Sequence, residues 1–194
     1  MAGEEAGPTI EGPSLALVPF GDRSITEEYL GWLNDPDLMR YSQQRFRRHT
    51  AESCREYLRS FQGSPNFFWS VIRRADSLAV GTMTAYVEPE HGCADIGILI
   101  GHPGIRGHGG GREAWGLGMA FLFEHRGMRK VTGGTVAANV PMVRIFLHWG
   151  MRLEGIRRDQ QLIDGCPTDV LLFGTLAGEW TPGRATRPKA PVRP

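Results

Sequence analysis

A glycine-rich segment near the middle of the chain has the composition of an anion-binding loop. Four glycines, Gly107 and residues 109–111, follow Arg106 and precede apolar residues at helical spacing. A helix N-terminus leaves backbone N–H groups unpaired and carries about half a positive charge, and glycine lets a ligand approach these groups closely. Arg106 adds guanidinium donors, and we expect Glu113 to accept hydrogen bonds from amides that the ligand leaves free. The segment predicts a phosphate-binding loop that requires no metal.

Two other glycine motifs bind phosphate groups and are alternatives for this segment. A P-loop requires Lys followed by Ser or Thr after its last glycine, whereas Gly111 precedes Arg112 and Glu113. Gly109, Gly111 and Ala114 match the dinucleotide pattern G-x-G-x-x-A. That turn directly follows its strand, and an acid comes about twenty residues later; neither condition holds here. The sequence therefore excludes the P-loop and disfavours a dinucleotide site.

The elements that would position this loop are a series of strands with helices inserted between them. Apolar periodicity and turn residues predict strands over residues 14–20, 66–74, 78–88, 94–101, 130–138, 152–163 and 168–176. Helices are expected over residues 25–34 with Ser24 as the cap, over 51–61 with Thr50 as the cap, from the glycine loop to near Gly127, and over 140–149. The short connections between residues 66 and 101 predict antiparallel pairing. The pattern as a whole predicts the α+β class.

Composition limits the class of protein. The 194 residues carry a formal net charge of +1, which argues against a dedicated nucleic-acid-binding protein. Cys54, Cys93 and Cys166 are widely spaced and predict neither a disulfide framework nor a zinc site. The first residues lack the pattern of a signal peptide, and no apolar run is long enough to span a bilayer. We expect a cytoplasmic location and no membrane partner.

The composition also predicts one domain between two tails. Residues 1–12 are rich in Gly, Glu and Pro, and residues 179–194 are rich in Pro and Arg with few large apolar side chains. Both tails have the composition of disordered segments. The predicted domain, residues 13–178, is long enough to bury a core without disulfides.

The glycine segment also resembles a known signature. In RGHGGG, residues 106–111, Arg106, Gly109 and Gly111 occupy the fixed positions of the R/Q-x-x-G-x-G/A motif of the GNAT superfamily of acetyl-CoA-dependent N-acetyltransferases. Four further segments are similar to the branch that contains ribosomal-protein N-terminal acetyltransferases and some amino-sugar acetyltransferases: residues 32–41, 95–114, 135–158 and 164–176. The resemblance covers about residues 15–176. It implies the GNAT fold, a mixed, mostly antiparallel sheet that is flanked by helices and splayed between its fourth and fifth strands.

The resemblance assigns roles to residues on the acetyl-donor side. The strand at 94–100 would be the fourth strand, and its exposed backbone would pair with the pantetheine arm of acetyl-CoA. The residues expected to contact this cosubstrate are Ile98, Leu99, Ile100, Arg106, Gly107, His108, Gly109, Gly110, Gly111, Arg112, Asn139 and Phe146. Leu99 and Ile100 would lie nearest the thioester, the glycine loop would hold the pyrophosphate, and Asn139 and Phe146 would lie along the pantetheine arm. No metal is implied.

An ammonium acceptor must lose a proton before it attacks the thioester. Asp95 is the first candidate for the base, because strand alternation places it on the same face as Gly97 and Leu99 and because relatives often have a carboxylate there. A solvated aspartate at the strand end is the alternative. Asp159 is the second candidate, although Gln161 aligns with the glutamate of some relatives and an ion pair with a neighbouring arginine is the alternative. An α-amine with a pKa of about 8 is already partly neutral, so water could also serve.

The residue that would protonate the departing thiolate differs from the usual family pattern. Many members have Tyr at the position of Phe146, and the N-terminally acetylating branch often has Ser at the position of Met142. Neither hydroxyl is present here. His108 and His148 are candidate substitutes, and a loop or packing role is the alternative for each.

The acceptor side is indicated by the basic segment RYSQQRFRRHT, residues 40–50. In relatives this region borders the acceptor groove, and it suits a polar or acidic acceptor; a solvated basic loop is the alternative. The resemblance implies direct attack of a primary amine on acetyl-CoA in a ternary complex. The expected acceptor is a protein N-terminus or a small amine such as an amino sugar, and the protein is expected to be a monomer or a homodimer. A non-catalytic acyl-CoA-binding module and a nucleic-acid-associated protein remain as alternatives.

Overall fold

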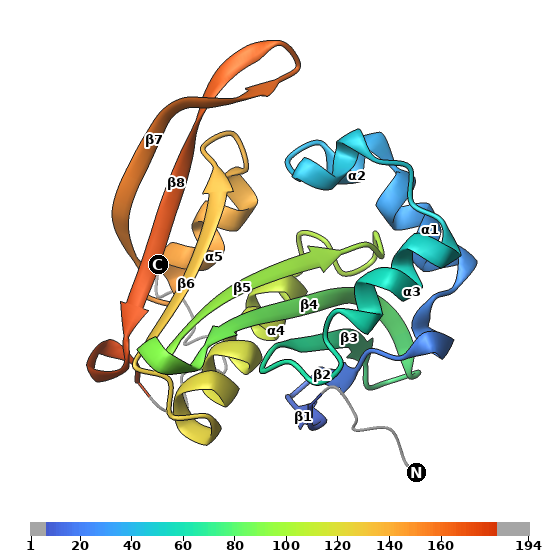
Figure 1. The fold of residues 1–194 in the computed structure, drawn as a ribbon, viewed down its shortest axis with the longest axis horizontal. Helices are drawn as coiled ribbons and strands as arrows, with labels where there is room; N and C mark the ends of the chain where they lie inside the picture. Colours follow the sequence, from blue (N-terminus) through green and yellow to red (C-terminus); the bar gives the residue numbers. More distant parts are fainter. Residues whose placement is uncertain (1–6, 182–194) are drawn as a thin grey trace, which may run out of the picture.

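The computed structural model describes residues 7–181, which form an eight-stranded sheet flanked by helices (Figure 1). The order of strands across the sheet is β1-β2-β3-β4-β5-β6-β8-β7. The strands are β1 (Ile10–Glu11), β2 (Leu15–Pro19), β3 (Phe67–Arg73), β4 (Leu78–Glu88), β5 (Cys93–Ile100), β6 (Lys130–Val136), β7 (Arg152–Ile163) and β8 (Cys166–Leu176). The helices are α1 (Glu27–Asn34), α2 (Pro36–Met39), α3 (Ala51–Arg59), α4 (Gly110–Ala120) and α5 (Val140–His148). The prediction of an α+β fold with a mixed, mostly antiparallel sheet is confirmed.

The one parallel pair within this sheet is also its shortest central contact. β5 pairs with β6 only where Cys93, Ala94 and Asp95 face Lys130, Val131 and Thr132. β5, in contrast, pairs with β4 along the whole length of β5, from Cys93 opposite Glu88 to Ile100 opposite Gly81. Figure 1 shows β5 and β6 diverging beyond the paired end; they are the fourth and fifth of the predicted strands, since β1 was not predicted. The segment of β5 after Asp95 therefore has a strand partner on one side only.

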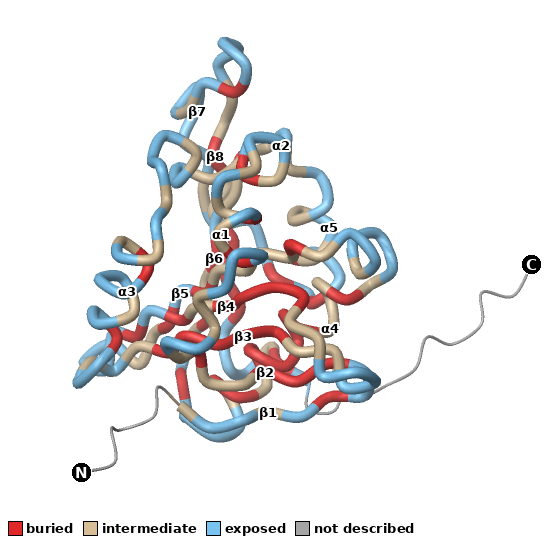
Figure 2. The backbone as a smooth tube through the Cα atoms, turned by 90° about the vertical axis from the view of Figure 1, so that its right-hand side faces the viewer, coloured by how far each residue is buried: buried red, intermediate tan, exposed pale blue. Residues whose placement is uncertain are grey.

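Apolar residues on both faces of β2–β5 explain why helices cover the sheet on both sides. On one face, Leu17, Trp69 and Val71 join Trp115 and Leu117 of α4 in a large buried cluster. On the other face, a smaller aromatic cluster contains Phe20, Tyr29, Trp32, Phe61 and Phe68. Figure 2 shows the buried backbone concentrated in the central strands. The two clusters fix α4 on one face and the α1–α3 segment on the other.

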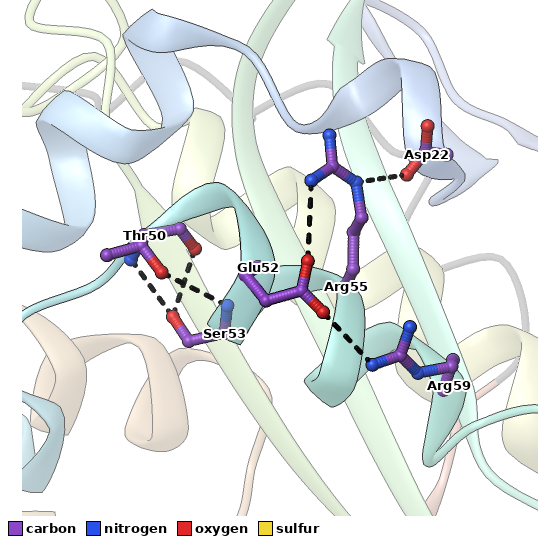
Figure 3. Close-up of polar contacts among 6 residues, drawn as sticks. All are labelled: Asp22, Thr50, Glu52, Ser53, Arg55 and Arg59. Carbon is purple, nitrogen blue, oxygen red and sulfur yellow. Dashed lines mark hydrogen bonds and ion pairs between the residues drawn. The ribbon is translucent and has the colours of Figure 1, made fainter.

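The predicted N-terminal cap of α3 is confirmed, and that of α1 is corrected. Thr50 begins α3, and its hydroxyl accepts a hydrogen bond from the backbone N–H of Ser53 at 3.2 Å; the Ser53 hydroxyl in turn accepts from the Thr50 N–H at 2.9 Å (Figure 3). The prediction that Ser24 caps the first helix is wrong. Thr26 is the cap, because α1 starts at Glu27 and the Thr26 hydroxyl reaches the N–H of Tyr29.

The ordered fold extends past both predicted domain limits. Ile10 and Glu11 pair with β2 inside the expected N-terminal tail. At the other end Trp180 is 9% exposed, and its indole N–H donates to Glu124 at 2.8 Å. The remaining parts of the predicted tails, residues 1–6 and 182–194, lie outside the described residues. Residues 7–181 contain no helix that is both long and apolar enough to cross a membrane.

Candidate functional site

The glycine loop presents free backbone amides at the start of α4. The N–H groups of Arg106 and His108 donate within the loop, to the carbonyls of Pro103 and Ile105 at 3.2 and 3.3 Å. Gly109 is the N-cap of α4, and the first helical hydrogen bond runs from the Glu113 N–H to the Gly109 carbonyl at 3.0 Å. Within residues 7–181, the N–H groups of Gly107 and residues 109–112 have no acceptor. Such unpaired amides at a helix N-terminus suit an anion.

Backbone conformation and close packing explain why the loop needs glycine. Gly107 and Gly109 have φ values of 79° and 92°, in the left-handed region that side chains disfavour. A Cβ atom at Gly110 would overlap the side chain of Ile105, and one at Gly111 would lie 3.3 Å from Ile145 Cδ1. Glycine at 107 and 109 thus avoids backbone strain, and glycine at 110 and 111 avoids close contacts with Ile105 and Ile145.

The structure corrects the role predicted for Glu113. Its carboxylate accepts hydrogen bonds from the backbone N–H groups of Ser14 at 2.7 Å and Leu15 at 2.9 Å, and it also contacts the Ser14 hydroxyl. Glu113 therefore attaches α4 to the start of β2 and does not serve the loop amides, because its side chain points to another element. The loop amides remain available to a ligand.

The basic side chains of the loop lie at its surface. Arg106 and His108 are exposed, and Arg112 is partly buried. The Arg112 guanidinium lies over the loop, since its Nη2 atom would be 3.2 Å from a Cβ atom placed on Gly109. The Arg112 carbonyl accepts a hydrogen bond from the indole of Trp149 at 2.9 Å, which fixes the first turn of α4.

A cavity of about 420 Å³ opens on the face of the sheet opposite α4. Its floor is the free part of β5, Gly97–Leu99, together with Thr82 and Thr84 of β4. Ser53, Cys54 and Tyr57 of α3 form one wall. Because Gly97–Leu99 belong to the segment that β6 leaves unpaired, the cavity meets the fork between β5 and β6.

The segment 42–49 forms the opposite wall of this cavity. It contributes Ser42, Gln44, Arg47, Arg48 and His49. Sequence reasoning proposed this basic segment for the acceptor but missed the α3 and β4 residues. The alternation of Thr82, Thr84 and Tyr86 along one face of β4 was the available signal, since polar residues at every second position mark a face that is not packed into the core.

Asp95 lies where β5 and β6 separate, on the face of Gly97 and Leu99. It is opposite Tyr86 on β4 and Thr132 on β6, and the Thr132 hydroxyl donates to its carboxylate at 2.8 Å. Although the residue remains exposed overall, neighbouring atoms shield the carboxylate from water and raise its pKa, the hydrogen bond from Thr132 lowers it, and the charge of Glu88 raises it further. Asp95 borders the fork but does not line the cavity.

Two tyrosines lie between Asp95 and the cavity. The hydroxyls of Tyr57 on α3 and Tyr86 on β4 are in direct contact. Burial raises the pKa of Tyr57 far above its usual value, and the contact with Tyr86 adds to this. Tyr57 is therefore a neutral hydroxyl at the cavity wall throughout the physiological pH range.

Asp159 occupies a different part of the molecule. It lies on β7 in the irregular stretch between Arg157 and Gln161, with a φ of 49°. Its backbone N–H donates to the carboxylate of Asp169 at 2.9 Å. The ion pair expected between Asp159 and a neighbouring arginine is not formed within residues 7–181. The structure does not bring Asp159 to the cavity.

Two residues expected along the pantetheine arm have structural contacts. The Asn139 side chain caps α5: its carbonyl accepts from the Met142 N–H at 3.4 Å, and its amide donates to the Thr135 hydroxyl at 3.0 Å. Phe146 is 0% exposed, with its ring 5.2 Å from Trp115 and 4.8 Å from Phe173. The predicted cosubstrate contact of Phe146 is not supported, because the side chain has no accessible surface.

The arginines of the basic segment have different partners. Arg40 forms a close ion pair with Asp164, and the Arg45 guanidinium donates to the Leu162 carbonyl at 2.9 Å. Leu162 lies near the end of β7 and Asp164 lies in the turn to β8, and Figure 1 shows this hairpin tip at the same end of the molecule as α2. These contacts connect the cavity wall to the far side of the fork.

The remaining candidate residues, the histidines and cysteines, do not form a common site within residues 7–181. His108 is exposed in the loop, and the exposed ring of His148 lies edge-on to Trp149 at 5.1 Å. Cys54, Cys93 and Cys166 are free thiols. Within residues 7–181, no three His, Cys, Asp or Glu side chains are placed to hold a metal ion.

Comparison with known proteins assigns the family. Residues 14–152 match the model of the acetyltransferase (GNAT) domain, so the chain belongs to the GNAT acetyltransferase domain family. The class of enzyme that this family defines is the acyl-CoA-dependent N-acetyltransferase. No curated protein matches the chain significantly.

Solved structures share the fold at low sequence identity. The GNAT-family acetyltransferase from Bacillus anthracis is 20% identical with a TM-score of 0.75, over 89% of this chain and 100% of that chain. The spermidine N-acetyltransferase from Vibrio cholerae, solved with CoA and spermine, is 18% identical with a TM-score of 0.76, over 86% and 97%. The ribosomal-protein-S5-alanine acetyltransferase from Vibrio fischeri is 14% identical with a TM-score of 0.71, over 91% and 100%. The prediction of the GNAT fold is confirmed.

Proposed function

We propose that the protein transfers an acetyl group from acetyl-CoA to a primary amine held in the 420 Å³ cavity. The observation that carries this proposal is the meeting of two features at Gly97–Leu99. These residues form the cavity floor and also belong to the part of β5 that β6 leaves unpaired. A donor along the open edge of β5 and an acceptor in the cavity would thus meet at one backbone segment.

The donor side of the proposal rests on the loop amides. The free N–H groups of residues 109–112 fit a diphosphate, and the guanidiniums of Arg106 and Arg112 supply further donors. The open edge of β5 at residues 98–100 would bind the pantetheine amides as another strand would. Asn139 keeps one amide hydrogen for this arm, because its other amide hydrogen donates to the Thr135 hydroxyl and only its carbonyl caps α5.

The reaction needs little beyond orientation and a base. The amine nitrogen attacks the thioester carbonyl, the new C–N bond replaces the C–S bond, and coenzyme A leaves as a thiolate that takes up a proton. We propose Asp95 as the final acceptor of the ammonium proton, because its raised pKa and its place at the fork suit that role. Since Asp95 does not line the cavity, the proton would reach it through water or through the hydroxyls of Tyr57 and Tyr86. Asp159 is the second candidate.

The acceptor is proposed to be a protein N-terminus or a small amine such as an amino sugar. The similarity to the Vibrio fischeri ribosomal-protein enzyme extends over 91% of this chain at 14% identity, which supports the fold and leaves the ribosomal-protein branch a hypothesis. A cytoplasmic location and a monomeric or homodimeric state are also hypotheses. A non-catalytic acyl-CoA-binding module is the second candidate function, favoured because Met142 and the buried Phe146 stand where hydroxyl residues are expected.

Thiol release from acetyl-CoA, measured with a panel of amines, tests the proposal. We expect release with at least one amine class, and binding of acetyl-CoA without release would favour the non-catalytic module. Asp95→Asn should lower kcat by about 10²-fold because it removes the base. Asp159→Asn is the matched control and should retain most activity; the opposite ranking would transfer the role of base to Asp159.

A further inference from the structure

We propose that the acceptor carries an acidic group, a phosphate or a carboxylate, close to the amine, and that Arg47 and Arg48 bind this group. The inference rests on the proposed function, since it concerns the substrate class of the same cavity. It also predicts that polyamines, whose other charges are positive, are poor acceptors.

The charges of the cavity wall support this inference. Arg47, Arg48 and His49 line the cavity, and its lining includes no Asp or Glu. The other polar residues of the lining, among them Ser42, Gln44 and Tyr57, are uncharged. A second ammonium in this cavity would find no carboxylate, whereas an anion would find two guanidiniums.

The structure separates these two arginines from the other two of the segment. Arg40 is paired with Asp164, and Arg45 donates to the carbonyls of Leu162 and Ser42. Arg47 and Arg48 have neither an ion pair nor a side-chain hydrogen bond within residues 7–181. Their guanidiniums are therefore free to bind a ligand, while their neighbours hold the segment against the β7–β8 hairpin.

The backbone beside Arg47 and Arg48 is held from both sides. The Asn34 side chain of α1 accepts from the His49 N–H and donates to the His49 carbonyl, both at 2.9 Å. The Arg47 N–H donates to the Gln44 carbonyl at 3.0 Å, and the His49 ring contacts the same carbonyl at 3.1 Å. A fixed backbone lowers the entropy cost of binding, so two exposed arginines can contribute more here than on a mobile loop.

Of the two arginines, only Arg47 lines this cavity alone. Arg48 also borders a second hollow, whose lining includes Glu27 of α1. Arg47 lines the cavity beside the free part of β5 and does not border that hollow. We therefore expect Arg47→Gln alone to have a clear effect and the double variant to have a larger one.

Matched pairs of amines test this inference. Glucosamine 6-phosphate is compared with glucosamine, and the peptide Ala-Glu-Ala with Ala-Gln-Ala, by thiol release and by calorimetric binding; spermidine is a further acceptor. We expect kcat/KM or affinity to be at least about tenfold higher for the acidic member of one pair, the size of a charge-assisted hydrogen bond. The pair that shows the difference identifies the source of the acidic group.

Variants distinguish a local effect from the net charge. Arg47→Gln/Arg48→Gln should bring the ratio within the pair close to one. Arg23→Gln/Arg59→Gln removes the same charge outside the cavity lining and should preserve the ratio. Ratios near one in the wild type, a preference for spermidine, or a ratio that survives in the first variant would overturn the inference. Binding preference without thiol release with any amine would support the inference and contradict the proposed catalytic function instead.

Discussion

At the scale of single residues, the loop depends on positions that tolerate no side chain. Gly109 has a φ of 92° and is followed by the free amides of the first turn of α4. A side chain there would be strained and would also stand beside the Arg112 guanidinium, over the surface that a diphosphate would occupy. The effect of backbone strain can be separated from exclusion of the ligand, because Gly127 also has a positive φ but lies away from the loop.

Gly109→Leu should raise the Kd for acetyl-CoA at least about tenfold, which is about 1.4 kcal/mol. Gly127→Leu is the control, since Gly127 has a φ of 64°, meets nothing within 4 Å and lies at the other end of the helix. Left-handed strain should cost each variant about 1–2 kcal/mol of stability. Calorimetry with acetyl-CoA, alongside thermal melting, checks both effects; equal affinity in the two variants would contradict the loop assignment.

Asp95 makes a prediction about pH. Because its pKa is raised in the folded protein above the ordinary 3.8, the folded chain holds this proton more tightly than the unfolded chain. Its contribution to stability is present below that ordinary pKa and is lost as pH rises through the raised value. The free energy of unfolding of the wild type minus that of Asp95→Asn should therefore decrease with rising pH above about 3.8. Urea unfolding from pH 3 to pH 7 measures it, and a constant or rising difference would contradict the assignment.

Among the helices, α3 forms one wall of the 420 Å³ cavity, and its N-terminal cap fixes where that wall begins. Figure 3 shows the Thr50–Ser53 cap beside a cluster of ion pairs, in which Glu52 contacts Arg55 and Arg59. The ion pairs are exposed and contribute little, so the cap is the main local determinant of where α3 begins. Ser53, Cys54 and Tyr57 follow it along the cavity wall.

Thr50→Ala should lower the free energy of unfolding by about 1 kcal/mol, the usual value of a helix cap. Since the first turn of α3 lines the cavity, we also expect a higher KM for the acceptor and an unchanged Kd for acetyl-CoA. Thr50→Ser retains the hydroxyl and should behave like the wild type. If Thr50→Ser were as unstable as Thr50→Ala, the methyl group and not the cap would be responsible.

At the scale of the whole molecule, the core joins the two sides of the fork. Phe146 of α5 packs against Trp115 of α4 and Phe173 of β8, and a Cβ atom at Gly133 of β6 would lie 3.1 Å from its ring. The β6–β8 side is thus attached to α4 although β5 and β6 share three pairs. Because this packing connects β6 and β8 to α4, the two sides of the fork stay in place without further pairing between β5 and β6.

Phe146→Ala should lower stability by about 3–5 kcal/mol, because it leaves a cavity in a closely packed core. Phe46→Ala is the matched control: Phe46 is 72% exposed, and its loss should change stability by about 0.5 kcal/mol or less. Denaturant unfolding measures both. A small effect at Phe146 would mean that the side chain is not a core residue and would reopen its predicted contact with the cosubstrate.

The sequence predicted the elements well because periodicity is local. The alternation in residues 78–88 gave β4 its observed limits, and Thr50 was identified from a cap motif. Contacts between distant segments could not be predicted in this way. The Glu113 carboxylate accepts a hydrogen bond from the Ser14 N–H, and Arg40 pairs with Asp164, 124 residues away. The folded sheet, and not the local sequence, determines those partners. A glycine motif marks the candidate donor site in the sequence, whereas the residues of the candidate acceptor cavity were only partly identified there.

A crystal structure of the complex with acetyl-CoA would decide whether the glycine loop binds the diphosphate. We expect diphosphate oxygens within hydrogen-bond distance of the backbone N–H groups of residues 109–112, with the pantetheine arm along β5 at residues 98–100 and the thioester facing the cavity floor. A cosubstrate bound elsewhere, or loop amides that remain bonded to other parts of the chain in the complex, would contradict it.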